Sequence, residues 1–313
     1  MKKIDLLSGA LSLALVVLLF GSDFVSAELF DSGRNSSDFV LMELDARPSA
    51  LGGAYVAVAD DLYAIRYNPA GLTNIKRTEF GVSYLSYVAE IDFGNIAFVG
   101  KIKKNFFYGF SSRGYYTVIE ERDSQVLPLG KSEGSGNITT LSFASKFFQG
   151  LSFGVNAKIV YESLYRYKAQ AIAGDLGMLY NLPAFGLNLG FSADNLFSTR
   201  MKFLDNSYSL PFSYRTGISR KILNEKLLIA LSTQKTENVP LIWNLGWEYS
   251  LYNLLSLRWG YQLGQELGNL SAGIGIRFKP RHIANEMQID YTILPLGQLG
   301  FSHRVSLVMR LAR

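Results

Sequence analysis

The sequence predicts an all-β protein that folds as a transmembrane antiparallel β-barrel of about 14 strands. Three observations predict this class. The chain begins like an export signal, and no later apolar run is long enough for a membrane-spanning helix. From about residue 78 onward, segments of roughly ten residues alternate apolar with polar or small side chains. Apolar residues make up 48% of the chain and charged residues only 18%, which suits a barrel that faces lipid.

The first 27 residues have the features of a cleaved signal peptide. Lys2 and Lys3 give a positive start, residues 10–20 form an apolar core, and Ala27 ends a run of small residues. The core falls short of the ~20 residues that a spanning helix needs. We therefore expect cleavage near Ala27 and export to a bacterial outer membrane, whose lipid is the first expected partner.

Strand number and length distinguish a membrane barrel from a soluble sandwich. Apolar and polar or small side chains alternate without interruption in residues 243–251, 255–263 and 287–293. A single strand of this kind would also fit a soluble β-sandwich. Membrane strands need about 9–11 residues, whereas soluble strands usually have about 5 or 6. About fourteen candidates of the longer kind begin near Glu79, Asp92, Phe106, Asn137, Leu151, Lys168, Phe185, Ser209, Lys226, Leu241, Leu254, Asn269, Glu286 and Phe301.

The connections agree with this count. An even number of strands places both ends of the barrel on the same side of the membrane. The two longest predicted connections, at about residues 118–136 and 196–210, are the third and the seventh. Both therefore fall on the outer side, where long loops are expected.

Composition and motifs argue against catalysis. The chain has no cysteine and only two histidines, His282 and His303, and its net charge of +5 is too small and dispersed to indicate nucleic acid. Ser302 and His303 are adjacent, but neighbouring strand residues point to opposite faces, so they cannot form a nucleophile–base pair. We therefore expect that the protein is not an enzyme and that it has no catalytic residue, cofactor or metal.

Residues 38–72 do not fit a membrane strand. Residues 46–61 begin with Pro48 and the pair Gly52 and Gly53, and then become rich in alanine. Asp60 or Asp61 could cap a short helix, which an Asn-Pro turn at residues 68–69 would stop. We therefore expect a partly helical hatch in the barrel lumen. The predicted division is residues 1–27 as signal peptide, 28–77 as N-terminal segment and hatch, and 78–313 as barrel.

Two strings in the chain resemble a known family. ARPSALGGAYVAVADD at residues 46–61, followed by YNPAGL at 67–72, resembles the N-terminal region of the FadL-like outer-membrane transport family, and especially its PorV/PorQ branch. Residues 290–307 resemble the C-terminal ending of that branch. The resemblance implies a fourteen-stranded barrel with an N-terminal hatch. It assigns the hatch motif to Gly52, Gly53, Asp60, Asp61, Asn68, Pro69 and Ala70, although any packed plug would need the same residue types.

The resemblance implies two alternative functions. The first is movement of hydrophobic small molecules such as fatty acids across the outer membrane, which an apolar pocket above the hatch would favour. The second is a component or cargo shuttle of a type IX-like protein secretion system, which would dock proteins on its outer loops. Four charges are predicted to face the lumen, where they line a channel or clamp the hatch: Glu248, Arg258, Arg277 and Asp290.

Overall fold

The structure is a computed structural model, and it describes residues 38–87, 91–122, 128–203, 206–265, 269–280 and 285–312. All of them belong to one compact unit, Gly33–Arg313. The predicted signal peptide and its cleavage site lie outside the described residues. Within the described ranges, no helix has the length and apolar character needed to cross a membrane.

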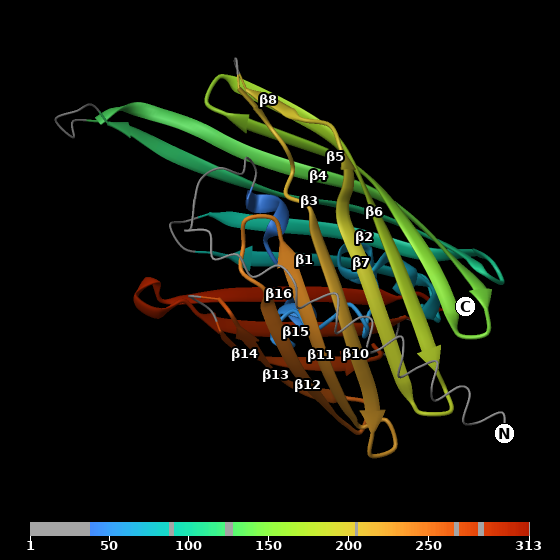
Figure 1. Cartoon of the computed structure of the whole chain (residues 1–313). Helices are drawn as coiled ribbons and strands as arrows, with labels where there is room; N and C mark the ends of the chain where they lie inside the picture. Colours follow the sequence, from blue (N-terminus) through green and yellow to red (C-terminus); the bar gives the residue numbers. More distant parts are fainter. Residues whose placement is uncertain are drawn as a thin grey trace. The chain divides into compact units, whose positions relative to one another are not determined.

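Fourteen strands of the described chain close into an antiparallel barrel (Figure 1), which confirms the predicted class and strand number. β1 (Glu79–Ser86) closes the barrel by pairing with β16 (Phe301–Arg310), in register from Glu79 with Arg310 to Ser86 with His303. The other wall strands are β2 (Asp92–Lys103), β3 (Phe106–Arg122), β4 (Pro128–Phe148), β5 (Leu151–Leu164), β6 (Tyr167–Leu182), β7 (Leu187–Ser198), β10 (Ser213–Ile222), β11 (Leu227–Thr236), β12 (Ile242–Leu251), β13 (Leu255–Leu263), β14 (Leu270–Phe278) and β15 (Glu286–Pro295).

The sequence analysis predicted two long outer connections, but in the structure both stretches contain strands. The predicted start of the fourth strand at Asn137 is too late, because β4 begins at Pro128 and pairs with β3 as far as Arg122 with Pro128. Figure 1 shows these two strands reaching beyond their neighbours. Residues 196–210 hold the end of β7 and a separate hairpin of β8 (Met201–Phe203) and β9 (Asn206–Tyr208). Strand pairs beyond the lipid need no apolar face, so their sequence lacks the alternation that marks a membrane strand.

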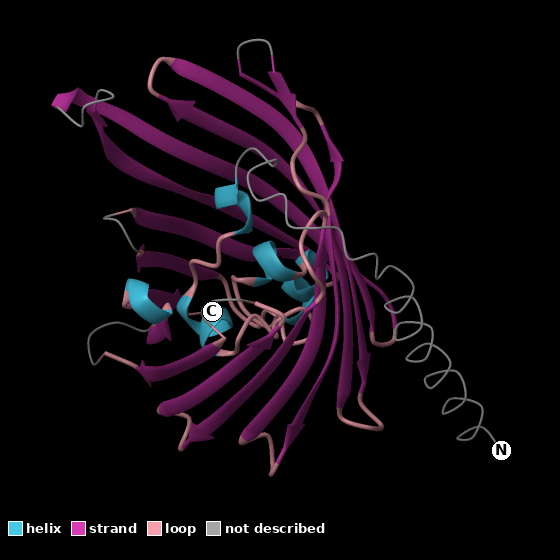
Figure 2. Cartoon of the chain, turned by 60° about the vertical axis from the view of Figure 1, so that its left-hand side comes forward, coloured by secondary structure: helices cyan, strands magenta, loops and turns pink. Residues whose placement is uncertain are grey.

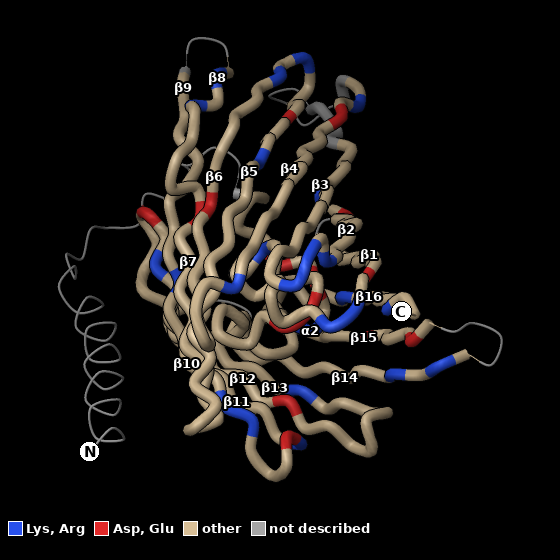
Figure 3. Tube along the Cα trace, turned by 90° about the vertical axis from the view of Figure 1, so that its right-hand side faces the viewer, with Lys and Arg blue, Asp and Glu red and all other residues tan. Residues whose placement is uncertain are grey.

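The strand walls separate an apolar outside from a mostly polar inside. In β5 the side chains at even positions from 152 to 162 are buried in the barrel, and most of those at odd positions are exposed on its outer face. The exposed positions include Phe153, Val155 and Ile159, whereas the buried ones include Asn156 and Lys158. Long stretches of the strands carry no charged position (Figure 3). This is the side-chain pattern of a barrel wall that faces lipid.

Short helices occupy the interior of the barrel (Figure 2). They are η1 (Asp38–Leu41), α2 (Ala46–Ala50), α3 (Ala64–Tyr67) and η2 (Pro69–Asn74); a further turn, η4 (Gly297–Leu299), precedes β16. We call residues 45–75 the plug. Its α2 packs against β13–β16 and its η2 against β3–β6, so it touches opposite walls.

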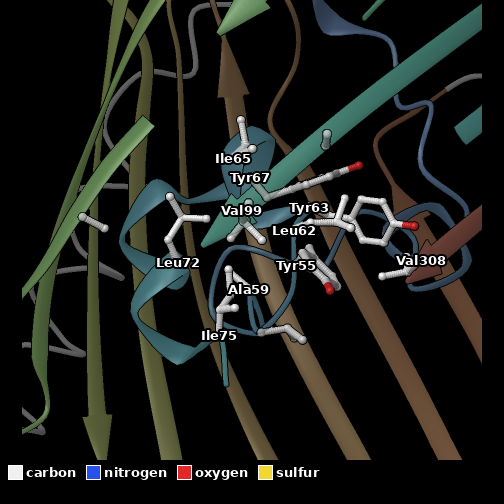
Figure 4. Packing of buried hydrophobic residues seen from close by; sticks show 14 of the residues in the cluster. Tyr55, Ala59, Leu62, Tyr63, Ile65, Tyr67, Leu72, Ile75, Val99 and Val308 are labelled. Atoms are coloured by element: carbon white, nitrogen blue, oxygen red, sulfur yellow. The ribbon is translucent and has the colours of Figure 1, made fainter. Parts of the chain in front are cut away.

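An apolar core joins the plug to the wall. Tyr55, Leu62 and Leu72 of the plug are almost fully buried and belong to one cluster with Val99 of β2 and Val308 of β16 (Figure 4). These plug side chains would otherwise face a polar lumen, and burial of each contributes roughly 1.5–3 kcal/mol. The plug is therefore held in place by the same effect that stabilises a soluble core.

Glycines in the wall allow the plug backbone to approach the strands directly. A Cβ atom on Gly154 would lie 2.3 Å from the Ala70 nitrogen, and one on Gly190 would lie 2.3 Å from the Val56 oxygen. No side chain fits in either space. Nine described strands each present to the plug a glycine whose Cβ would lie within 3.0 Å of a plug atom, which is a side-chain atom at Gly81, Gly109, Gly217 and Gly273. We call this set the glycine belt: Gly81, Gly109, Gly154, Gly177, Gly190, Gly217, Gly246, Gly260 and Gly273.

Substitution in the glycine belt tests this packing. In Gly190→Val the new side chain would overlap the plug backbone, and overpacking of this kind costs about 1–3 kcal/mol or more. We expect a lower temperature for loss of the compact, heat-modifiable gel band. Gly94→Val is the matched control, because a Cβ at Gly94 of β2 meets nothing within 4 Å. Equal melting of the two variants would contradict the assigned role of the belt.

Candidate functional site

Gly52 and Gly53 of the predicted hatch motif form the turn that follows α2. Their φ angles are +58° and +74°, in the left-handed region that favours glycine. Gly52 also lies against β13, where a Cβ would be 2.8 Å from the Tyr261 nitrogen. Two separate physical constraints therefore require glycine at this position.

Asn68, Pro69 and Ala70 of the motif join the plug to the wall. The Asn68 side-chain amide donates to the main-chain oxygens of Val56, at 2.8 Å, and of Met178 in β6, at 2.9 Å. Its oxygen accepts from the Ala70 amide at 3.2 Å and so caps η2, which begins at Pro69. The predicted stop of the preceding helix at this Asn-Pro turn is confirmed, since α3 ends at Tyr67.

Asp60 and Asp61 bind Arg47, a residue that the sequence analysis did not single out. Arg47 Nη1 lies 2.6 Å from Asp60 Oδ1 and 2.6 Å from Asp61 Oδ2. Asp61 also accepts from the Tyr63 amide at 3.0 Å, just before α3, but it is not the N-cap residue of that helix. The expected cap is therefore a hydrogen bond in the turn that leads into the helix, and the main partner of both carboxylates is Arg47.

An alternating row of charges connects the plug with the wall. Arg47 Nε donates to Glu248 of β12 at 2.8 Å, and Arg258 of β13 pairs with Glu248 at 2.6 Å. Arg258 Nη1 then lies 2.7 Å from Asp290 of β15. We call Asp61, Arg47, Glu248, Arg258 and Asp290 the ionic clamp. Of the four charges predicted to face the lumen, Glu248 contacts the plug directly, and Arg258 and Asp290 continue the row along the wall.

Asp60 lies beside the buried clamp and pairs with its Arg47. Burial disfavours the charged form of Asp60, but the Arg47 guanidinium and the Lys221 ammonium outweigh burial and hold the pKa of Asp60 below its usual range. Asp45, at the other end of the plug, has the opposite balance: burial raises its pKa in spite of hydrogen bonds from Asn95 and Ser83. A buried pair of this kind is costly to break, because it leaves one charge without a partner.

Arg277, the fourth predicted charge, makes no ion pair with the clamp, although Arg47 and Glu248 face the same cavity. It lines a polar cavity of about 810 Å³ at the end of the barrel where β10–β11 and β12–β13 turn, and its Nε is 3.3 Å from Glu286. Asp60, Lys221 and Arg310 line the same cavity. We call this cavity the vestibule. It opens at the end that holds the start of β1 and the end of β16.

On the other side of the plug, part of the inner wall is apolar. Inward-facing positions of β4, β5 and β6 carry Ile138, Val160, Ala169, Ala171 and Ala173, all buried in one cluster. Side chains of the chain itself cover this patch: Val40, Met201 and Leu210, with Phe39 and Phe203 at the side. We call this apolar patch of the inner wall the outer chamber. Sequence analysis missed it because alternation predicts a polar inner face, although Ala169, Ala171 and Ala173 break that rule visibly.

Ser302 and His303 diverge as predicted. Ser302 is fully buried in the barrel, whereas His303 is exposed and stacks on Tyr291, with Nδ1 2.7 Å from the phenolic oxygen. In the described residues no group of three or more His, Asp or Glu side chains is placed to hold a metal ion.

Part of the chain matches a protein family. A model of an uncharacterised protein family (UPF0164) matches residues 31–177, a little under half of the chain. No curated protein matches the sequence.

Three solved structures share the fold over nearly their whole length. The CymD monoaromatic hydrocarbon channel has 13% identity and a TM-score of 0.62, covering 85% of this chain and 96% of its own. The toluene transporter TbuX of Ralstonia pickettii has 14% identity and a TM-score of 0.62, covering 88% and 100%. The toluene transporter TodX of P. putida has 12% identity and a TM-score of 0.57, covering 85% and 96%. The chain therefore has the barrel architecture of these channels.

Removal of Arg47 tests the ionic clamp. Arg47→Gln leaves the Asp61 carboxylate buried without its cation, at a cost of about 3–5 kcal/mol. We expect a lower unfolding temperature and a higher conductance in planar bilayers as the plug loosens. Arg277→Gln is the control for stability, because a half-exposed pair contributes at most about 1 kcal/mol. The same unfolding temperature for both variants would argue against the clamp.

Proposed function

We propose that this chain is a channel of a bacterial outer membrane that moves hydrophobic small molecules inward without catalysis. The outer chamber is the observation that carries the proposal. Barrel interiors are normally polar, and an apolar patch inside one has a cost unless something apolar covers it. A hydrophobic molecule that enters from outside would find an apolar surface at Ile138, Val160 and Ala171 once the side chains that cover them move.

The fold and the outer surface support this proposal. The channels that share the barrel are named for monoaromatic hydrocarbons and for toluene. Exposed apolar side chains on the outer wall, such as Phe143 and Ile172, suit contact with lipid hydrocarbon. The export signal in residues 1–27 suits delivery to that membrane. We further propose fatty acids as the transported molecules, on the basis of the resemblance to the FadL-like family.

The plug divides the path into two compartments of different polarity. The outer chamber is apolar, and the vestibule on the far side is lined by charged and polar groups. A hydrophobic molecule therefore binds above the plug and has no comparable apolar surface below it. We propose that the hatch motif and the ionic clamp hold the plug between captures, and that passage requires the plug to shift.

Filling the outer chamber tests the proposed path. Ala171→Phe places a ring in the chamber, and we expect uptake of labelled toluene and dodecanoate to fall by about tenfold in a Gram-negative host without other such channels. Ala157→Phe is the matched control, because Ala157 is on the outer face of neighbouring β5. Both variants must show the heat-modifiable band. Uptake equal to the unsubstituted protein in Ala171→Phe would exclude this path.

A second candidate role rests on the long outer ribbon. β3 and β4 contain 17 and 21 residues and extend past their neighbours, which offers a surface to a protein partner. We propose a secretion role of the PorV/PorQ type as the alternative. Mild extraction followed by mass spectrometry separates the two: retained lipid or fatty acid supports transport, and a retained secreted protein supports the alternative.

A further inference from the structure

Two neighbouring turns of the barrel wall carry a cluster of exposed lysines. One turn joins β2 to β3 and the other joins β4 to β5, and the Lys146 amide donates to the Asn105 oxygen at 3.0 Å, so the turns lie side by side. Both lie at the end of the barrel where β1 begins and the vestibule opens, because consecutive strands are antiparallel. We call these four residues the lysine cluster: Lys101, Lys103, Lys104 and Lys146.

No nearby stretch of these strands supplies a carboxylate to the lysine cluster. Residues 93–119 and 134–161, which cover most of β2–β5, contain no aspartate and no glutamate. Among the described residues, none of the four ammonium groups makes an ion pair. Like charges on adjacent turns repel one another. An anion from outside the chain would therefore be bound here without displacing a carboxylate of the protein.

An aromatic ring positions two of the four lysines. Lys101 Nζ lies 5.6 Å and Lys146 Nζ lies 6.0 Å from the centroid of the Phe107 ring, which is itself almost fully buried. A cation at this distance from an aromatic face is attracted to the ring. The two ammonium groups are therefore held on one ring, and the turn with Lys103 and Lys104 lies next to them.

The same strand ends expose large apolar rings. Phe147 and Phe148 are 66% and 70% exposed, and their ring centroids are 4.7 Å apart. Phe147 also contacts Phe153, at an outward position of β5, with centroids 6.1 Å apart. Together with Phe106, at an outward position of β3, these rings face the membrane hydrocarbon. We call this set the phenylalanine patch: Phe106, Phe147, Phe148 and Phe153.

Other described turns at this end of the barrel lack the combination. The turns at residues 183–186 and 252–254 carry no charged residue, and the turn between β10 and β11 sets Glu225 beside Lys226. An excess of positive charge next to exposed phenylalanine rings is therefore a property of one sector of the wall, at β2–β5. A general requirement of barrel turns would not produce this restriction.

We propose that the lysine cluster and the phenylalanine patch form a binding site for one phospholipid with a net negative head group, such as phosphatidylglycerol. The phosphate lies among the lysine ammonium groups, which long flexible stems bring to the head-group level. The acyl chains lie on the phenylalanine rings. A zwitterionic phospholipid carries an ammonium group of its own, which the lysines repel, so net charge decides the preference. This inference is independent of the transported molecule and requires only that the barrel lies in a membrane.

Native mass spectrometry of the full-length purified protein tests the head-group preference. The protein is equilibrated with equal amounts of phosphatidylglycerol and phosphatidylethanolamine that have the same acyl chains. We expect bound phosphatidylglycerol to exceed bound phosphatidylethanolamine by about fivefold or more, the advantage that roughly one lysine gives at an anionic lipid surface. The double variant Lys103→Gln/Lys104→Gln should lower this ratio at least about threefold.

The matched control for charge is Lys168→Gln/Lys202→Gln. It removes the same charge from exposed positions on β6 and β8, at the opposite end of the barrel, and should leave the ratio unchanged. All variants must show the heat-modifiable band, so that loss of folding is not read as loss of binding. Equal retention of the two lipids by the unsubstituted protein, or an unchanged ratio in Lys103→Gln/Lys104→Gln, would overturn the site.

A second comparison separates a lipid from a simple anion. Phe148→Ala should lower the retention of both lipids by about threefold while the ratio between them stays the same, because the rings contact acyl chains. Phe197→Ala, which removes a ring of similar exposure on β7, is the control and should not change the retention. Glycerol phosphate, which has the phosphate without the chains, should not displace phosphatidylglycerol at equal concentration. Displacement by glycerol phosphate would overturn the assignment to a lipid.

Discussion

Direct contact between the plug backbone and the glycine belt is the interaction on which the rest of this structure depends. A lumen lined by ordinary side chains would leave no room for residues 45–75. Because glycines such as Gly154 and Gly190 lack a Cβ, the plug backbone touches strands on several sides of the barrel. That close approach brings Arg47 within reach of Glu248 and places Asn68 against the oxygen of Met178.

The plug separates two parts of the lumen that differ in polarity. Towards the strand turns the space is wide and polar, with the clamp at its inner surface. Towards the outer side the wall becomes apolar at Ile138, Val160 and Ala171, and η1 covers it. Under the transport function proposed above, a hydrophobic ligand would be stabilised at this apolar patch and not in the polar vestibule.

The buried cations of the described chain differ in how their charge is compensated, and most of them, including Arg66 and Lys158, pair with a carboxylate. In the ionic clamp, positive and negative groups alternate, and each guanidinium meets a carboxylate within 3 Å. At Arg113 only main-chain oxygens are in place. A fully paired buried network favours one fixed arrangement of its side chains, which suits the attachment of the plug to the wall.

The sequence by itself determined the barrel, its strand number and the position of the plug. Alternation over residues such as 243–251 is a local property, because adjacent residues of any strand face opposite sides. Turn chemistry at Asn68 and Pro69 is local as well. What only the tertiary structure decided is which residues meet across the lumen. Arg47 is 201 positions from Glu248, and Val40 is 73 positions from Arg113. Barrel closure and plug packing together bring such residues into contact, and no pattern in a single stretch of sequence records those distances.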